Sequence, residues 1–151
     1  MTALAPTLRR LSFVIGLLLA GAPQIAAQAQ QPLVIGNDRG GLVGKKAAEI
    51  EQIKRIGRRV EIRGAICYSS CTMYLGAADV CISPQTTFGF HGPSKGGTPL
   101  PADQFERWSR LMASYYNAPL QHWFLQQGRY VITDIYRMSG AQLIRLGYQT
   151  C

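Results

Sequence analysis

The sequence has few acidic residues and little histidine. Its 151 residues include eight Asp or Glu against 16 Lys or Arg, and only two His, which gives a net charge of +8. The basic residues are scattered, and no aromatic residues alternate with them as a nucleic-acid platform requires. Lys45-Lys46, Lys54-Arg55 and Arg58-Arg59 fall in or just after one helix-like segment. We interpret them as a solvated helix face and expect no nucleic-acid partner.

Closely spaced pairs of metal ligands are also missing. Cys67 and Cys71 are separated by three residues, but the sequence has no second CxxC and no HxxxH. A structural zinc site needs four ligands at such spacings. We therefore expect no bound metal, and nothing in the sequence calls for another cofactor.

Long apolar runs are absent except near the N-terminus. Arg9 and Arg10 precede a short apolar stretch over residues 11–22, and Ala27-Gln28-Ala29 fits the small-x-small pattern that signal peptidase cuts. The stretch is too short, and too rich in Gly and Ala, for a comfortable membrane span. The pattern predicts a cleaved signal peptide, with an uncleaved anchor as the alternative.

This interpretation divides the chain into a signal peptide over residues 1–29 and one domain over residues 30–151. The leader carries two arginines and no acids, so the net charge falls from +8 to +6 on cleavage. We expect the mature protein to be periplasmic or secreted, with no membrane contact once the leader is removed.

The four cysteines are Cys67, Cys71, Cys81 and Cys151. An even number in an exported chain favours disulfides, because the compartment is oxidising. We expect at least one bond, with Cys67 and Cys71 as participants. Four cysteines allow three full pairings, and the sequence does not choose among them.

Apolar periodicity predicts alternating strands and helices in the first part of the domain. The predicted strands are residues 32–35, 59–66, 80–82 and 86–91, and the predicted helices are residues 42–56, ended by Gly57, and 72–78. This order predicts an α/β domain with right-handed crossovers and a largely parallel sheet.

The second part of the domain is predicted to be mainly helical. Residues 92–101 are rich in Gly and Pro and are expected to form no regular element. Residues 102–127 form the longest helical stretch, broken near Pro119, and its many aromatic side chains are interpreted as core or subunit contacts. A last short helix is expected between Ser139 and Gly147.

The candidate catalytic residues lie where the predicted strands end. Ser69 and Ser70 occupy the turn before helix 72–78, and His91 ends a strand. Because parallel strands place their carboxyl ends at one edge, the Gly40-Gly41 turn should lie nearby. A serine nucleophile, a histidine base and backbone N–H groups for an oxyanion are what acyl transfer requires.

Four motifs carry a family resemblance. They are Gly36-Asn37-Asp38-Arg39-Gly40-Gly41, Cys67-Tyr68-Ser69-Ser70-Cys71-Thr72, Phe90-His91-Gly92-Pro93, and the segment from Met138-Ser139 to Gly147-Tyr148. In this order they resemble the Clp-type serine proteases of the crotonase-like superfold, and more closely the exported, periplasmic Clp-protease-like proteins of bacteria. The resemblance covers about residues 32–151.

The resemblance implies a Clp-protease/crotonase-like α/β fold, a parallel sheet with crossover helices. It also implies Ser69 as nucleophile, His91 as base, and the backbone N–H groups of Gly41 and Ser70 as the oxyanion hole. Three alternatives stand beside these roles: Ser69 as only a helix N-cap, His91 as only a turn residue, and Ser70 as the nucleophile.

The chain departs from the family in two places. The family's catalytic Asp aligns near Val131, which has no carboxylate, and the nearest acid, Asp134, is three residues further on. The family also has a strand and a helix before the Gly-Gly turn, where this domain has only residues 30–36. The fold is therefore expected to be N-terminally truncated, with a sheet edge that another subunit covers.

The sequence thus predicts a serine hydrolase or peptidase acting on peptides or proteins, with a homo-oligomer expected from the open edge. The alternative is a catalytically inactive relative that binds peptides or a partner protein. A secreted, disulfide-bonded structural protein is the third interpretation.

Overall fold

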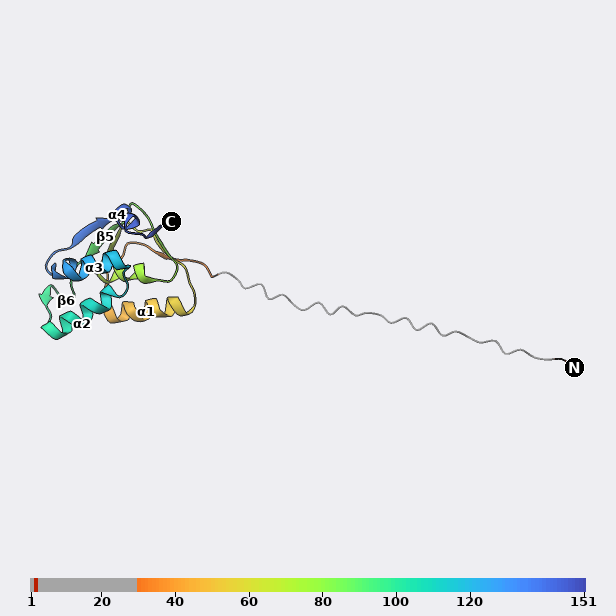
Figure 1. Ribbon diagram of the computed structural model, residues 1–151, viewed down its shortest axis with the longest axis horizontal. Helices are drawn as coiled ribbons and strands as arrows, with labels where there is room; N and C mark the ends of the chain where they lie inside the picture. Colours follow the sequence, from red (N-terminus) through yellow and green to blue (C-terminus); the bar gives the residue numbers. More distant parts are fainter. Residues whose placement is uncertain (1, 3–29) are drawn as a thin grey trace.

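Two main β-sheets organise the computed structural model, which describes residue 2 and residues 30–151 (Figure 1). The first sheet is parallel throughout, in the order β1 (Leu33–Ile35), β2 (Val60–Ile62), β4 (Val80–Ile82), β9 (Gln149–Thr150). The second has the order β3 (Ile66–Tyr68), β5 (Thr87–Phe90), β8 (Tyr136–Ser139), with β3 parallel and β8 antiparallel to β5. The predicted signal peptide lies outside the described residues, apart from residue 2.

Helices pack around these sheets. They are α1 (Val43–Arg55), the 3₁₀-helix η1 (Ser69–Gly76), α2 (Ala102–Ala113), α3 (Ala118–Gln126), the 3₁₀-turn η2 (Gly128–Tyr130) and α4 (Gly140–Arg145). In Figure 1, α1 and α2 lie along one side of the domain and α4 lies on the opposite side. Within the described residues, no helix is long and apolar enough to cross a bilayer. The predicted α/β class with a parallel sheet is confirmed, whereas β8 and β9 were not predicted.

The strand predicted over residues 59–66 is two strands in different sheets. Between β2 and β3, the backbone N–H groups of Arg63 and Gly64 both donate to the Ile35 carbonyl, each at 3.0 Å. A Cβ on Gly64 would lie 2.2 Å from the carbonyl of Gly36, so only glycine fits this crossing. The prediction of one continuous strand was wrong because apolar alternation persists across the change of sheet.

The Gly- and Pro-rich segment 92–101 contains a small hairpin, contrary to prediction. Strands β6 (Ser94–Lys95) and β7 (Thr98–Pro99) pair antiparallel. Gly96 and Gly97 form the turn with φ values of +58° and +81°. Glycine at both central positions is the usual requirement of a tight hairpin turn.

The long helical stretch predicted over residues 102–127 is broken near Pro119, as predicted, and the break lies just before the proline. Helix α2 ends at Ala113, and the Asn117 side chain then accepts a hydrogen bond from the Leu120 N–H at 3.2 Å. Pro119 falls in the first turn of α3, where its missing N–H has no intrahelical partner to lose. The predicted cap of the last helix is confirmed: Ser139 caps α4.

An aromatic cluster fills the core beside the strand that leads to His91. Phe90 packs edge-on against Tyr116 and Trp123, with ring centroids 5.7 and 5.5 Å apart, and Tyr116 packs in the same way against Phe124 at 5.3 Å. The core role predicted for the aromatic residues of the long helical stretch is confirmed for Tyr116 and Phe124, which are buried.

Candidate functional site

Ser69 directly follows β3 and is the first residue of η1, in a strained turn. Its φ is +58°, the only positive φ of a non-glycine residue in the described chain. Such a conformation costs free energy and is enriched at functional sites. Glycine opposite makes the turn fit: a Cβ on Gly40 would lie 2.6 Å from the Ser69 Cβ and 2.9 Å from the Ser70 nitrogen. The Gly40-Gly41 turn and the serine turn are therefore in close contact, as the sequence predicted.

A disulfide brackets this turn. Cys67 and Cys71 are bonded, with their Cα atoms 5.3 Å apart, and both are fully buried. The predicted participation of these two cysteines is confirmed. The bond ties the last strand residues before Ser69 to the first turn of η1, and so limits the conformations open to the serine.

The second disulfide lies in the first sheet. It joins Cys81 of β4 to Cys151, just after β9, with a Cα separation of 4.9 Å. All four cysteines of the sequence are thus paired. Two disulfides indicate an oxidising, extracytoplasmic environment.

The structure distinguishes the two serines. Ser70 is fully buried, and its hydroxyl donates to the Gly41 carbonyl at 3.2 Å. Ser69 is half-buried and lines a cavity. Tyr68, rather than Ser69, is the N-cap of η1, and no side chain caps that helix. These contacts argue against Ser70 as the nucleophile and against a capping role for Ser69.

His91 follows β5 and is half-buried. Its Nδ1 atom lies 2.7 Å from the Gly92 carbonyl oxygen. A carbonyl only accepts, so Nδ1 carries the proton and donates it. In the neutral ring this leaves Nε2 unprotonated, which is the state that a general base requires.

One cavity of about 560 Å³ brings together three of the predicted site residues, Gly41, Ser69 and His91, but not Ser70 or Asp134. Its walls come from the Gly-Gly turn and α1, the serine turn, the segment after β5, and α2. The lining residues are Gly41, Leu42, Val43, Gly44, Lys45, Ser69, His91, Pro93, Ser94, Lys95, Leu100, Trp108 and Met112. In the described residues no hydrogen bond joins the Ser69 hydroxyl to His91; in free enzymes such bonds are often long and tighten only with substrate bound.

The predicted orienting role of Asp134 gains no support from its contacts. Its side chain is 80% exposed, accepts from the Ile135 N–H at 2.7 Å and lies 3.9 Å from Arg137. Asp134 and His91 both line a second, smaller cavity of about 290 Å³, but no hydrogen bond joins them. The Gly92 carbonyl already accepts the hydrogen bond from His91 Nδ1, the nitrogen that an orienting carboxylate would contact.

Two backbone N–H groups remain as candidates for an oxyanion hole. Ser70 lies in the first turn of η1, where N–H groups have no intrahelical acceptor. Gly41 follows Gly40, whose own N–H is taken by the Asp38 carboxylate at 2.6 Å. Of the two glycines, Gly40 is therefore the one whose N–H is already bonded, and the oxyanion role of Gly41 stays a prediction.

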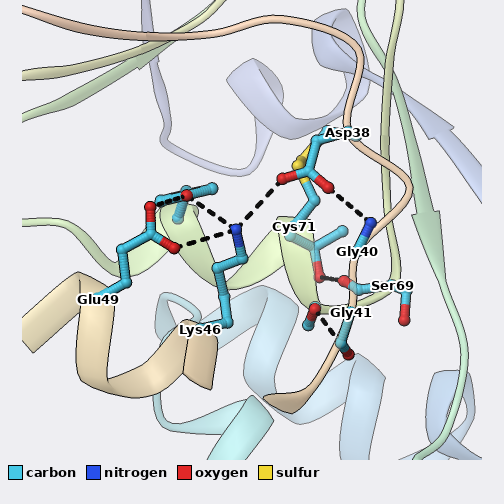
Figure 2. Close-up of polar contacts among 11 residues, drawn as sticks. Asp38, Gly40, Gly41, Lys46, Glu49, Ser69 and Cys71 are labelled. Atoms are coloured by element: carbon cyan, nitrogen blue, oxygen red, sulfur yellow. Dashed lines mark hydrogen bonds and ion pairs between the residues drawn. A yellow bond between two sulfur atoms is a disulfide. The ribbon is translucent and has the colours of Figure 1, made fainter. Parts of the chain in front are cut away.

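A polar cluster next to the Gly40-Gly41 turn was not predicted from the sequence (Figure 2). The Lys46 ammonium contacts Asp38 and Glu49, each at 3.3 Å, and the Tyr74 hydroxyl at 2.8 Å, while Tyr74 donates to Glu49. The Lys46 side chain is only 13% exposed, so its interpretation as part of a solvated face was wrong. The sequence did contain an indication of this burial, because Lys46 lies four residues before the buried Ile50 and so shares its helix face.

Burial and charge act in opposite directions on this cluster. Burial lowers the pKa of Lys46, but the hydrogen bond with Tyr74 and the charges on Asp38 and Glu49 outweigh it and raise that pKa. Burial and the hydrogen bond to Glu49 raise the pKa of Tyr74 to about 12. At neutral pH Lys46 is therefore a cation and Tyr74 a neutral phenol.

Comparison with known proteins does not identify a family or a function for the chain. No family model matches the chain, and no curated protein matches it. Within residues 30–151, no group of three or more His, Cys, Asp or Glu side chains lies close enough together to hold a metal.

Proposed function

We propose that this protein is a serine hydrolase or peptidase with a Clp-protease-like fold. The observation that carries the proposal is that Ser69, His91 and Gly41 line one cavity. The left-handed turn at Ser69 supports it, because this conformation is costly and serves no capping purpose.

In the proposed reaction the Ser69 hydroxyl attacks an acyl carbon, and His91 Nε2 takes the serine proton. The N–H groups of Gly41 and Ser70 stabilise the oxyanion. The imidazolium then protonates the leaving group, and water hydrolyses the acyl-serine by the same steps. The Gly92 carbonyl keeps Nδ1 as a donor, but it carries no full charge and stabilises the imidazolium less than a carboxylate would. We therefore expect slower turnover than a full triad gives.

The cavity wall indicates the kind of substrate. Most of its side chains are apolar, among them Leu42, Trp108 and Met112. Two lysines, Lys45 and Lys95, also line it, and no acidic residue does. We propose substrates with an apolar acyl group, including peptides, and discrimination against those with a positive charge near the scissile bond.

The proposed location is the periplasm or the outside of the cell. The two disulfides support an oxidising compartment, and the N-terminal sequence pattern supports export by a cleaved leader. A homo-oligomer is proposed through β1, an edge strand whose Val34 is 56% exposed. Sedimentation velocity of the mature protein tests it, since a monomer at high concentration contradicts it.

A catalytically inactive module that binds peptides or a partner protein is the second candidate. Two observations favour it: within the described chain, His91 makes no hydrogen bond with Ser69, and no carboxylate is bonded to His91 Nδ1. The same apolar cavity would then hold a ligand without cleaving it.

Reaction with a fluorophosphonate distinguishes the two candidates. We expect the mature wild-type protein to gain one covalent label per chain, detected as a mass increase. Ser69→Ala and His91→Ala should each abolish labelling, whereas Ser70→Ala should only weaken it, because its backbone N–H remains. A wild-type protein that stays unlabelled by every serine-directed probe would favour the binding module.

A further inference from the structure

The peptide that carries the Gly41 N–H has glycine on both sides. Without side chains such a peptide can rotate at little steric cost, so its orientation must be fixed by other groups. Both flanking peptides are bonded. The Gly40 N–H donates to Asp38 Oδ1 at 2.6 Å, and the Gly41 carbonyl accepts from the Ser70 hydroxyl at 3.2 Å (Figure 2).

Asp38 is itself held through its backbone and through its side chain. Its N–H donates to the Ile66 carbonyl at 3.1 Å, and its carbonyl accepts from the Tyr68 N–H at 2.9 Å. This bridge places Asp38 beside β3, the strand that leads into the serine turn. Its second carboxylate oxygen accepts from the Lys46 ammonium at 3.3 Å.

Lys46 ties three segments together. An ammonium has three N–H donors, and Lys46 has three partners: Asp38 before the glycine turn, Glu49 on its own helix α1, and Tyr74 on η1. The two candidate oxyanion donors belong to two of these segments, because Gly41 follows Asp38 and Ser70 lies in the first turn of η1. The cluster thus fixes the turn of one donor relative to the helix of the other.

We propose that Asp38 and Lys46 are positioning residues of the oxyanion hole. Asp38 fixes the orientation of the Gly40-Gly41 turn, and Lys46 holds the Asp38 carboxylate in place and neutralises it. This inference rests on the proposed function, because it gives the turn a role in acyl transfer. Neither side chain lines the cavity, so both act through the backbone of the turn.

Hydrolysis of p-nitrophenyl butyrate separates positioning from binding. Asp38→Ala frees the Gly40 N–H, and we expect kcat to fall by about 100-fold, comparable to the loss of one oxyanion donor, with KM nearly unchanged. Asp38→Asn keeps an acceptor for the Gly40 N–H, so its loss should stay within about 10-fold. Lys46→Met should lie between these values, and Lys46→Arg should recover part of the loss.

A matched control is Glu61→Gln. Glu61 is a carboxylate of similar exposure on β2, ion-paired with Arg59 and Arg63 at 3.4 and 2.6 Å, and it does not line the cavity. Its loss should leave kcat at the wild-type value. Circular dichroism identifies any variant that does not fold; if Asp38→Ala is one, Lys46→Met carries the test, because it keeps the Asp38 side chain and its bond with the Gly40 N–H.

A second readout does not depend on catalysis. In nuclear magnetic resonance of the free protein, Asp38→Ala should raise the amide exchange rate of Gly40, whose N–H loses its acceptor, and should shift the amide resonance of Gly41. Glu61→Gln should do neither. A wild-type exchange rate at Gly40 together with an unshifted Gly41 amide in Asp38→Ala would overturn the positioning role. So would fluorophosphonate labelling of Asp38→Ala at the wild-type rate. A wild-type protein that never reacts with the probe would instead overturn the proposed hydrolase. The amide exchange measurement would then still test whether Asp38 orients the Gly40-Gly41 turn.

Discussion

The two sides of the cavity are held in different ways. The serine side is fixed by a buried disulfide, by the contact of Gly40 with Ser69, and by the ion-paired cluster around Lys46. The histidine side is fixed by backbone contacts: His91 donates to the Gly92 carbonyl, and the Gly92 N–H donates to the Val131 carbonyl at 2.8 Å. The structure thus fixes the proposed nucleophile and the proposed oxyanion donors more firmly than the proposed base.

The physical reason lies in what each part must do. Oxyanion donors stabilise charge only if they are oriented before the reaction, so rigidity on the serine side is useful. A histidine base needs one accessible, unprotonated ring nitrogen. The Gly92 carbonyl favours that tautomer, because it accepts a hydrogen bond from Nδ1 and so keeps the proton on that nitrogen. Changes on the serine side should therefore reduce activity more than changes beyond His91.

Gly40→Ala should have the largest effect. A Cβ there would lie 2.6 Å from the Ser69 Cβ, and the φ of +89° disfavours any side chain. We expect a loss of about 1–3 kcal/mol in the free energy of unfolding and of at least about 100-fold in labelling rate. Gly36→Ala is the control, because its Cβ would meet nothing within 4 Å. Equal labelling of both variants would contradict the close fit of the two turns.

The two disulfides should differ in what their removal changes. Loop-closure entropy predicts about 4 kcal/mol for Cys81–Cys151, whose cysteines are 70 residues apart, and about 2 kcal/mol for Cys67–Cys71, which are 4 apart. We expect the Cys67→Ala/Cys71→Ala pair to lower the labelling rate more, although it lowers stability less. Denaturant unfolding and labelling, measured on both double variants, check this. A larger loss of labelling in the Cys81→Ala/Cys151→Ala variant would show that the first disulfide does not position Ser69.

The cluster around Lys46 should make part of the stability sensitive to alkali. The folded-state pKa values of Lys46 and Tyr74 are raised, that of Tyr74 from 10.0 to about 12. A raised pKa means that the folded state favours the protonated form, so this stability is complete below pH 10 and is lost as the pH rises towards 12. Tyr74→Phe should lose less stability over that range, measured by urea unfolding at each pH. If the free energy of unfolding falls with pH as steeply in Tyr74→Phe as in the wild type, Tyr74 does not contribute to this alkali sensitivity.

Lys95 should have a modest effect on substrate choice. It lines the cavity from the exposed β6–β7 hairpin, so its charge is largely screened. Lys95→Gln should lower kcat/KM for an anionic apolar ester by about two- to five-fold at low salt, and less at high salt. A neutral ester of equal length is the control. An equal loss for both esters would indicate a packing role for the side chain instead.

Asp134→Asn should have the smallest effect. The side chain is 80% exposed and makes no hydrogen bond with His91 in the described residues. We expect labelling within about two-fold of the wild-type rate, because a triad acid would cost orders of magnitude. A large loss would mean that Asp134 reaches His91 once a ligand is bound.

The sequence was most informative where one residue type has one physical use. The C-cap glycine after the first helix, the cap at Ser139 and the cysteines beside the serine turn were predicted and are present. The approach of Ser69 and His91 to one cavity also followed from strand order, because they come at the carboxyl ends of the parallel neighbours β3 and β5. Gly41 follows β1 of the other sheet, and it reaches the same cavity through the bridge of Asp38 to Cys67.

The sequence was least informative where contacts between distant segments decide. Nothing local marks the change of sheet at Gly64, which depends on its contact with Gly36. The burial of Lys46 depends on Asp38 and Tyr74, which are 8 and 28 residues away along the chain. Strand β9 has only two residues, so it has no periodicity to detect.

The most direct test of the account is to locate the fluorophosphonate adduct by tandem mass spectrometry. Trypsin cuts after Arg63 and Lys95, so one peptide contains both candidate serines and His91. The account predicts a single adduct on Ser69, absent after heat denaturation and absent in His91→Ala. An adduct on Ser70, or labelling that persists in His91→Ala at the wild-type rate, would contradict it.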